Sequence, residues 1–212
     1  ACVAMAAPLL AAWSDVQLQT PPDTDVDAVP GLIDTLANGQ KAWNVRGVEA
    51  RAAILDRAAD ALERDLAHWC ALIVREGHRT WVDAIPEVRE AADFCRYYAQ
   101  QARGLMVPRT LRGITGERNT YRLRGRGVWV CISPWNFPLA IFTGQVVAAL
   151  VTGNAVAAKP AEQTPGVAAH LIALLHDCGV PRDVLAGVYG DGRIGAALVA
   201  QPKVAGVAFT GS

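Results

Sequence analysis

The second half of the chain, from Gly127 onward, alternates short apolar runs with longer helical segments. The runs contain almost no polar residues, which is typical of strands that are buried on both faces. Strands are predicted at 128–132, 155–158, 185–189 and 204–209, and helices at 139–151, 164–178 and 190–200. Repeated strand–helix–strand connections require parallel strands with helices on both faces of the sheet. The alternation therefore predicts an α/β fold built on a parallel sheet.

The first half of the chain is predicted to be helical. From Val48, apolar residues recur at helical spacing and predict one long amphipathic helix that breaks near His68 and ends at Gly77. Arg51 falls on the polar face of this helix and is expected to be exposed. A second helix is predicted to follow Pro86, with aliphatic and aromatic core residues on its apolar side.

Residues 1–47 carry weaker signals. A turn is predicted at 21–24 and a helix at 28–43, and neither suggests any chemistry. The apolar opening at 1–12 lacks an initiator Met and a basic region, so no secretory signal is predicted. The chain stops at 206–212 on a strand and the start of a turn, and we expect it to be a piece of a longer protein. No apolar run reaches the roughly 18 residues that cross a membrane.

The segment between the two halves is rich in arginine. Seven arginines and one acid, Glu117, lie between Arg103 and Arg126. Such a run can form a basic patch for nucleic acid. An exposed β-hairpin kept soluble by charge is the preferred interpretation, because only Tyr121 can stack on a base. The chain is accordingly divided into a helical part at 1–107, an arginine-rich hairpin at 108–126 and a β-α-β part at 127–212.

The composition favours a small-molecule partner. Lys and Arg together number 20, as do Asp and Glu, and this balance argues against binding to nucleic acid or to a membrane surface. The five cysteines include no C-x-x-C pair and the four histidines show no ligand spacing, so neither a disulfide framework nor a metal site is predicted. Reduced thiols are typical of the cytoplasm, where we expect the protein to reside.

The turn after the first predicted strand carries a candidate for catalysis. In Ser133–Pro138, two prolines bracket a Trp-Asn pair between a strand and a helix. The side chain of Asn136 offers an amide donor that can stabilise negative charge developing on a substrate oxygen. The same side chain can instead cap the following helix. The octapeptide 131–138 by itself does not decide between these two interpretations.

A glycine-rich loop follows the third predicted strand. Gly190–Gly195 has the spacing G-x-G-x-x-G and opens a helix, so a phosphate can approach its backbone N–H groups. The acidic residue expected about 20 residues later, which would bind the ribose, is absent. Lys159 and Glu162, which follow the second strand, can bind the ribose instead. The alternatives are a solvated loop charge for Lys159 and a helix-start charge for Glu162.

Four of these segments fall at one edge of the predicted sheet. Each begins where a predicted strand ends, and they are 133–138, 159–162, 190–195 and 209–212. The carboxyl ends of parallel strands share an edge, and ligands bind there in open α/β sheets. Their coincidence predicts a ligand site at this edge, which we call the carboxyl edge.

In their order and spacing, these segments resemble the aldehyde dehydrogenase superfamily. The motifs are Ser133–Pro138, Lys159–Pro165 and Phe209–Ser212. Glu87–Tyr98 and Cys131–Gln145 are most similar to the L-glutamate γ-semialdehyde (1-pyrroline-5-carboxylate) dehydrogenase module of the bifunctional proline utilization A (PutA) flavoenzymes. The resemblance begins near residue 30. It implies N-terminal helices followed by part of the Rossmann-like sheet of the aldehyde dehydrogenase fold.

The resemblance also implies a role for each segment. Asn136 would be the oxyanion-hole amide. NAD would be held by Ile132, Ser133, Pro134, Trp135, Lys159, Ala161, Glu162, Gly192, Gly195, Phe209, Thr210, Gly211 and Ser212. A carboxylate beside the ribose would repel a 2′-phosphate, which favours NAD over NADP. The hairpin would be the pair of strands used for homo-oligomerisation, and FAD would belong only to a proline dehydrogenase domain outside this chain.

In this family the nucleophilic cysteine and the glutamate base follow the Phe-Thr-Gly-Ser segment, so both would lie outside this chain. Cys131 belongs to an apolar strand and is expected to be a buried, inert thiol. The leading hypothesis is an N-terminal fragment of an NAD-dependent aldehyde dehydrogenase that oxidises L-glutamate γ-semialdehyde to L-glutamate in proline catabolism. The alternatives are a dehydrogenase for another semialdehyde, and a nucleotide-binding or scaffolding fragment without catalysis.

Overall fold

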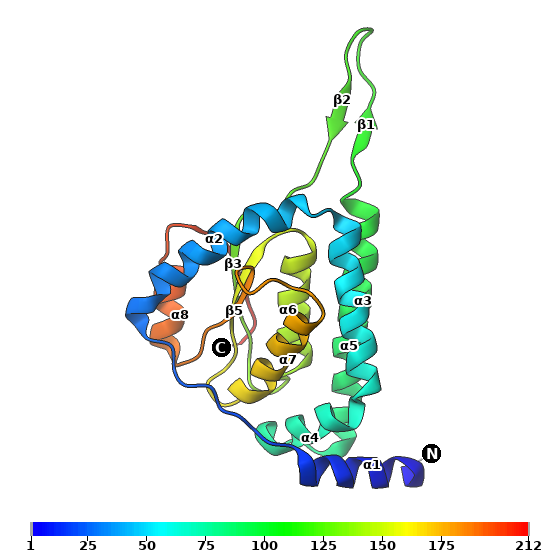
Figure 1. Cartoon of the computed structure of the whole chain (residues 1–212), viewed down its shortest axis with the longest axis vertical. Coiled ribbons are helices and arrows are strands. Elements are labelled where there is room, and N and C mark those ends of the chain that lie inside the picture. The colour runs from blue at the N-terminus through cyan, green and yellow to red at the C-terminus, as the bar shows by residue number, and fades with distance from the viewer. Residues whose placement is uncertain (1, 212) are drawn as a thin grey trace.

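The computed structural model describes residues 2–211 of the 212-residue chain. Figure 1 shows helices around a small sheet, with a hairpin extending from this body. In chain order, the elements are α1 Cys2–Asp15, η1 Val26–Ala28, α2 Val29–Val45, α3 Val48–Arg64, α4 Leu66–Gly77, α5 Trp81–Leu105, β1 Arg109–Leu111, β2 Asn119–Tyr121, β3 Val128–Ile132, α6 Ala140–Val151, β4 Ala155–Lys159, α7 Pro165–Asp177, β5 Leu185–Gly187, α8 Gly192–Val199 and β6 Val204–Phe209. None of the helices described is both long enough and apolar enough to span a bilayer.

The main sheet has four strands in the order β5-β4-β3-β6, and every neighbouring pair is parallel. β4 is buried along its whole length, and the apolar sequence at 155–158 predicts this for all but its last residue. Helices α2 and α8 pack on one face of the sheet, and α6 and α7 pack on the other. α3 and α5 form a further layer outside α6. The predicted α/β fold with a parallel sheet is confirmed.

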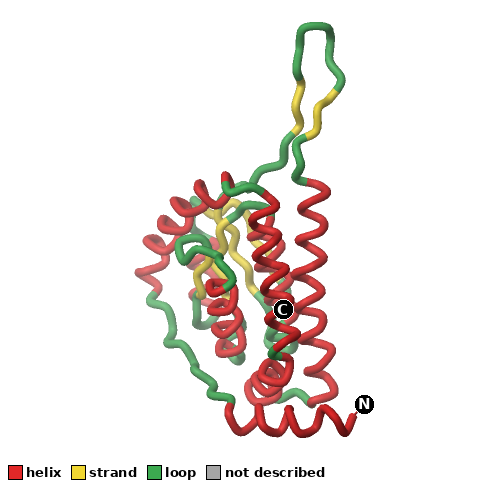
Figure 2. Tube along the Cα trace, turned by 45° about the vertical axis from the view of Figure 1, so that its right-hand side comes forward, coloured by secondary structure: helices red, strands yellow, loops and turns green. Residues whose placement is uncertain are grey.

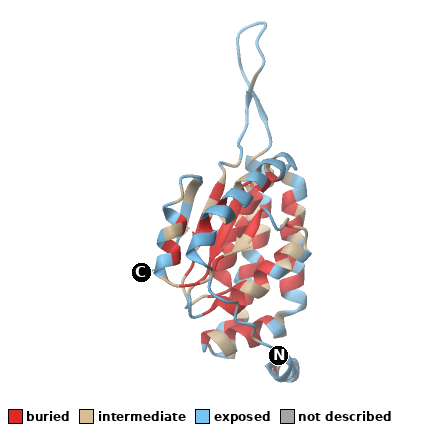
Figure 3. Ribbon diagram, turned by 60° about the vertical axis from the view of Figure 1, so that its left-hand side comes forward, coloured by how far each residue is buried: buried red, intermediate tan, exposed pale blue. Residues whose placement is uncertain are grey.

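One hydrophobic core joins the sheet to the helices (Figure 3). Leu62 of α3, Phe142 and Leu150 of α6 and Val156 of β4 are all fully buried in it. α6 contains no charged residue, because it lies between the sheet on one side and α3 and α5 on the other. The position of this buried helix fixes where the turn before it lies.

The helical stretch predicted from Val48 to Gly77 is present as two helices, α3 and α4; its predicted start and end are confirmed, and the break predicted near His68 is three residues too late. The break between α3 and α4 falls at Asp65 rather than at His68, because Asp65 leaves the helical conformation with φ −103° and ψ 27°. α4 includes Gly77, and its cap is His78 in the left-handed conformation, with φ 50°. Gly77 was expected at the cap position, but the residue in the left-handed conformation that favours glycine is the next one, His78.

The start predicted for the next helix is also wrong. α5 begins at Trp81, and Pro86 lies within it. Thr80 caps the first turn, because its Oγ1 accepts from the N–H of Asp83 at 3.2 Å. Because of this cap, α5 begins five residues before Pro86, which had been expected to precede the helix.

Arg51 is 2% exposed, and the prediction of an exposed side chain is wrong. Its guanidinium donates to the carbonyl oxygens of Val151 at 2.9 Å, Trp43 at 3.2 Å and Asn44 at 3.1 Å. These carbonyls belong to the last turns of α6 and α2, where backbone acceptors have no intrahelical partner. Arg51 therefore joins the carboxyl ends of two helices to α3.

β1 and β2 form an antiparallel hairpin that projects away from the body (Figure 2). Thr110 pairs with Thr120 at its centre. Leu111, Ile114 and Tyr121 are exposed on it. An exposed hairpin is therefore present where the charge pattern predicted one.

Candidate functional site

The carboxyl ends of β3, β4 and β6 lie side by side. Ile132 pairs with Lys159 of β4 and with Phe209 of β6. Two backbone hydrogen bonds continue this pairing into the turns: the N–H of Ser133 donates to the carbonyl of Lys159 at 3.2 Å, and the N–H of Thr210 donates to that of Ile132 at 3.0 Å. Three of the four predicted segments therefore meet at the carboxyl edge.

The glycine-rich loop joins the same edge. A methyl group on Gly195 would lie 3.6 Å from Cδ of Lys159, so the first turn of α8 packs against that side chain. Gly190 has φ 131°, and a methyl group there would lie 2.8 Å from Ile194, so this position requires glycine. A methyl group on Gly192 would meet nothing within 4 Å. The loop is therefore closely packed at its first glycine and open at its second.

Asp191 is the cap of α8. Its carboxylate accepts from the backbone N–H of Arg193 at 2.9 Å and from Nε of Arg193 at 2.9 Å. These two bonds, the backbone one first, hold the pKa of Asp191 below its usual value. The helix predicted to open in this loop is confirmed, and an ionised side chain fixes its first turn.

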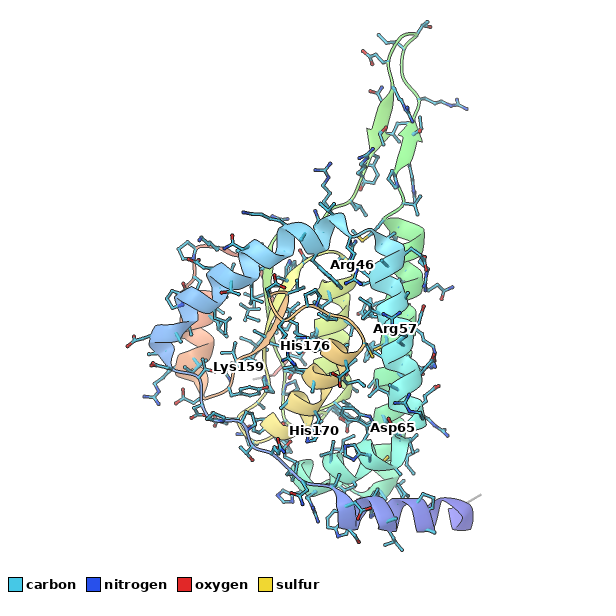
Figure 4. The ribbon with its side chains drawn as sticks, in the orientation of Figure 1. Arg46, Arg57, Asp65, Lys159, His170 and His176 are labelled. Atoms are coloured by element: carbon cyan, nitrogen blue, oxygen red, sulfur yellow. The ribbon has the colours of Figure 1, made fainter. Side chains whose placement is uncertain are left out.

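Lys159 is buried at the end of β4, with 6% of its surface exposed. Figure 4 shows its side chain inside the body, between the α8 and α7 ribbons in that view. Its Nζ donates to the carbonyl of Pro160 at 3.3 Å, and it takes part in no ion pair with any residue from 2 to 211. Burial lowers the pKa of Lys159, against the opposing effect of the Glu162, Asp191 and Asp23 carboxylates. The alternative of a solvated loop charge is therefore wrong, and the ammonium keeps donors for a ligand.

Residues 23 and 24 also reach the carboxyl edge, although no chemistry was expected in this part of the chain. The N–H of Thr24 donates to the carbonyl of Tyr189 at 2.9 Å, and the N–H of Tyr189 donates to Oγ1 of Thr24 at 2.9 Å. These bonds place Asp23 beside Gly190, near enough for its carboxylate to oppose the lowering of the Lys159 pKa by burial. The turn predicted at 21–24 was the only signal, and a local turn does not reveal a partner 165 residues away.

Asn136 is half-buried in the turn between β3 and α6. No hydrogen bond joins its side chain to another residue in the part of the chain that the structure describes. It does not cap α6, whose N-cap is Leu139; the carboxylate of Glu87 accepts from the N–H of Leu139 instead, at 2.9 Å. The alternative of a capping role is therefore wrong, and the amide of Asn136 is free to donate to a ligand oxygen.

A cavity of about 520 Å³ lies between residues 76–79, at the end of α4, and the turns that follow β3 and β4. Trp135 lines it from the first turn, and Gln163 and Thr164 line it from the second. The buried hydroxyls of Ser133 and Thr164 have no hydrogen-bond partner among the residues described. Because a buried hydroxyl without a partner is costly, these atoms favour a polar ligand at the edge.

Four of the other residues predicted to bind NAD lie in the turns that follow β3, β4 and β6. They are Pro134, Ala161, Glu162 and Gly211. Glu162 is exposed. Thr210 is tied to α6, because Nε2 of Gln145 donates to its Oγ1 at 2.9 Å. Ser212 lies outside the described residues, so the structure does not test its predicted role in NAD binding.

Four cysteines, Cys70, Cys95, Cys131 and Cys178, are poor nucleophiles. Cys131 is fully buried in β3, and burial raises the pKa of its thiol to about 12. Burial also raises the pKa values of Cys70 and Cys95 to about 12, and raises that of Cys178. Cys131 is thus the inert thiol that was predicted. Among the side chains of residues 7–211, no group of three or more His, Cys, Asp or Glu is placed to hold a metal ion.

Sequence reasoning missed two glutamates that contact the turns of the carboxyl edge. Glu87 bonds to the start of α6, as described, and Glu76 accepts from the N–H groups of Gly166 and Val167, each at 2.7 Å. Both glutamates lie in helices of the first half of the chain. The sequence signal for a helix cap depends on spacing within one helix, so it cannot identify a cap that another helix supplies.

Comparisons with known proteins agree with this geometry. Residues 7–212 match the model of the aldehyde dehydrogenase family. The chain is 51% identical over 162 residues to the bifunctional protein PutA of Rhizobium meliloti, which covers 76% of this chain and 12% of PutA. It is 40% identical over 181 residues to 1-pyrroline-5-carboxylate dehydrogenase 2 of Bacillus subtilis, which covers 85% of this chain and 35% of that protein. A crystal structure of a Bradyrhizobium japonicum PutA variant superposes with a TM-score of 0.91 at 51% identity, over 96% of this chain and 21% of that chain.

The chain therefore spans only a small part of its bifunctional relatives and about a third of the dehydrogenase from Bacillus subtilis. The matched residues include the four segments of the carboxyl edge and both helical layers around the sheet. The resemblance predicted from the motifs is confirmed, and the chain belongs to the aldehyde dehydrogenase family.

Proposed function

We propose that this chain is the NAD-binding part of an aldehyde dehydrogenase that oxidises L-glutamate γ-semialdehyde to L-glutamate in proline catabolism. The observation that carries the proposal is the carboxyl edge, where the free amide of Asn136 and the buried ammonium of Lys159 lie on neighbouring strand ends. The substrate is inferred from the relatives, which are named PutA and 1-pyrroline-5-carboxylate dehydrogenase.

The residues at the edge fit a dinucleotide. Lys159 and Glu162 offer a donor and an acceptor for the two ribose hydroxyls of the adenosine half. Gly192 leaves open space at the start of α8, where N–H groups favour a phosphate. In a family that uses NAD or NADP, the carboxylates of Glu162, Asp191 and Asp23 around Lys159 favour NAD, because they would repel a 2′-phosphate.

The remaining contacts to NAD follow from position along the edge. Ile132, Ser133, Pro134 and Trp135 would line the nicotinamide side, and Phe209, Thr210, Gly211 and Ser212 would lie by the pyrophosphate and the second ribose. Ala161 and Gly195 would border the first ribose. When bound, NAD supplies the acceptor for the hydride that leaves the substrate carbon.

Asn136 would act on the substrate oxygen. In the complete enzyme, a cysteine thiolate that this chain does not contain attacks the aldehyde carbon, and the carbonyl oxygen gains negative charge. The side-chain amide of Asn136 donates to that oxygen and stabilises the charge where it develops. No rotation of a hydrogen-bonded side chain is needed, because the amide has no competing partner within the described residues.

The proposal extends to the other parts of the chain. The division into a helical part at 1–107, a hairpin at 108–126 and a β-α-β part at 127–212 would correspond to the NAD-binding domain with its oligomerisation strands. The exposed edges of β1 and β2 suit pairing with a second copy of the chain. FAD would be bound only by a separate proline dehydrogenase domain, and the enzyme would act in the cytoplasm.

The test is aldehyde oxidation by the complete protein that contains this chain. NADH formation with L-glutamate γ-semialdehyde is compared with that from other semialdehydes, and Asn136→Ala is expected to lower kcat by about 10²–10³-fold, as for one oxyanion donor. Asn38→Ala, at an exposed position of α2, is the control and should leave kcat unchanged. A normal rate for Asn136→Ala would remove this amide from the mechanism, and faster turnover of another semialdehyde would overturn the substrate.

A further inference from the structure

The two helices that follow the edge turns lack caps of their own. α6 begins after the turn that holds Asn136, and α7 begins after the turn that holds Glu162. Their N-cap residues, Leu139 and Thr164, make no side-chain capping bond. The first N–H groups of a helix have no intrahelical acceptor, and buried ones must find a partner elsewhere.

Glu87 of α5 supplies the partner for α6. Its side chain is 2% exposed, and its Oε1 accepts from the N–H groups of Leu139 at 2.9 Å and Ala140 at 3.4 Å. Its Oε2 is buried and has no hydrogen-bond partner in the described range. Burial raises the pKa of Glu87, so this acceptor is held at a cost in desolvation. Asn136 lies only three residues before the bonded N–H of Leu139.

The residues before Glu87 hold the same turn from a second side. The guanidinium of Arg79 lies over the ring of Phe137, 4.8 Å from its centroid. A methyl group on Gly77 would lie 3.5 Å from Pro138. The chain from the end of α4 to the start of α5 therefore packs along the turn that carries Asn136.

Glu76 of α4 supplies the partner for α7 in a different way. Its Oε1 accepts from the N–H of Gly166 at 2.7 Å, and its Oε2 accepts from the N–H of Val167 at 2.7 Å. Both carboxylate oxygens are therefore engaged. These bonds fix the start of α7 and hence the turn 160–164, which connects it to Lys159.

We propose that Glu76 and Glu87 are positioning residues that divide the site between them. Glu87 holds the turn of Asn136 and so sets the rate of the chemical step, whereas Glu76 holds the turn of Lys159 and Glu162 and so sets the affinity for NAD. This inference rests on the proposed function for its kinetic consequences. The two hydrogen-bond sets stand independently of that function.

The test is a comparison of two alanine variants in the complete dehydrogenase. Glu87→Ala is expected to lower kcat by about 10- to 100-fold with the Kd for NAD within about twofold, because misplacement of a catalytic group by about 1 Å has effects of this size. Glu76→Ala is expected to raise the Kd for NAD by about 10-fold with kcat at saturating NAD within about twofold. Titration with NAD alone gives Kd without requiring turnover.

The glutamine variants separate hydrogen bonding from general loss of structure. In Glu87→Gln the side-chain carbonyl can still accept from both N–H groups, since one oxygen of Glu87 makes both bonds, and kcat should recover to within about threefold of wild type. In Glu76→Gln the amide nitrogen faces an N–H donor, so one bond is lost and the weaker NAD affinity should persist. Gly166→Ala provides a third variant, because its methyl group would lie 2.7 Å from Oε1 of Glu76 and displace the carboxylate.

Leu62→Ala is the control for lost stability, because Leu62 is fully buried in α3, a helix that contains neither Glu76 nor Glu87. It should lower the melting temperature and leave both kcat and Kd for NAD near wild type. If Glu76→Ala and Glu87→Ala change kcat and Kd in parallel, the division of roles is wrong. The same holds if Glu87→Gln is as slow as Glu87→Ala.

Amide hydrogen exchange distinguishes failure of this inference from failure of the proposed function. Glu87→Ala should speed exchange at Leu139 and Ala140, and Glu76→Ala should speed it at Gly166 and Val167, whatever reaction the protein catalyses. If the wild-type protein binds NAD but oxidises no aldehyde, the proposed function fails while the exchange and Kd results still decide the positioning roles. Unchanged exchange at both helix starts would overturn them.

Discussion

Replacing Lys159 by methionine is expected to change stability and NAD affinity in opposite directions. Lys159 is 6% exposed, and its Nζ has a single carbonyl partner, that of Pro160 at 3.3 Å. Methionine is similar in length and uncharged, so it can fill the same space without the cost of burying an ammonium. The ammonium of Lys159 is instead needed to donate hydrogen bonds to a ligand hydroxyl.

The expected magnitudes follow from these contacts. Without NAD, the free energy of unfolding of Lys159→Met should rise by about 1–2 kcal/mol, which is the lower part of the range for replacing buried charges, because the nearby carboxylates already offset some of the desolvation. With NAD, one charged hydrogen bond is lost, which costs about 1.5–3 kcal/mol. That cost corresponds to an increase of about 10- to 150-fold in the Kd for NAD.

The stability difference should also depend on pH. Burial lowers the pKa of Lys159 below its ordinary value of 10.5, so between these two pKa values the folded protein binds fewer protons than the unfolded chain. Wild-type stability therefore rises with pH across that window, whereas Lys159→Met lacks this contribution. The advantage of the variant should be largest at neutral pH and should vanish above pH 10.5.

Thermal unfolding with and without NAD, at neutral pH and near pH 10, measures both effects. Lys203→Met is the matched control, because Lys203 is 59% exposed and pairs with Asp34 at the surface, and it should change neither the melting temperature nor the Kd for NAD. A Lys159→Met protein that melts below wild type without NAD would refute the argument about the buried charge. One that binds NAD like wild type would refute the role assigned to the ammonium.

Three further predictions concern stability and reactivity. Arg51→Met should lower the free energy of unfolding by about 3 kcal/mol in urea denaturation, because three helix-end carbonyls lose a charged donor. Gly190→Ala should lower the melting temperature and weaken NAD binding, since its φ of 131° and the contact with Ile194 both disfavour a side chain; Gly192→Ala is the control and should not change the melting temperature. Cys131 should resist alkylation by iodoacetamide at pH 8 until the protein unfolds, as judged by mass spectrometry, because burial raises its pKa to about 12.

The sheet and its carboxyl edge were predictable because both depend on local patterns. A strand buried on both faces is expected to be apolar, and residues 155–158 of β4 show this directly. The pairing of Ile132 with Lys159 and with Phe209 then follows, since parallel strands end at one edge. The carboxyl edge can therefore be located from the order of strands and helices along the chain alone.

The errors at Arg51, Lys159 and Asp23 share one physical cause, which is a partner that is distant in the sequence. Arg51 lies on the polar side of its own helix, yet it is buried in the core, where the carbonyl of Val151, 100 residues away, accepts from its guanidinium. Lys159 was considered as a loop charge, yet it continues β4 and is covered by α8. Asp23 lay in a segment without a functional motif, and only the bonds between Thr24 and Tyr189 bring it to the edge.

Residues in the first half of the chain support the carboxyl edge through contacts that no sequence motif predicts. The positions of Glu76 and Glu87 depend on α4 and α5, which pack against each other and against α7 and α6. If those helices shifted, the N–H groups at the starts of α6 and α7 would lose their acceptors, and the turns before them would lose their anchors. The position of Asn136 therefore depends on α4 and α5 as well as on the sheet. One continuous hydrophobic core joins these helices to the sheet.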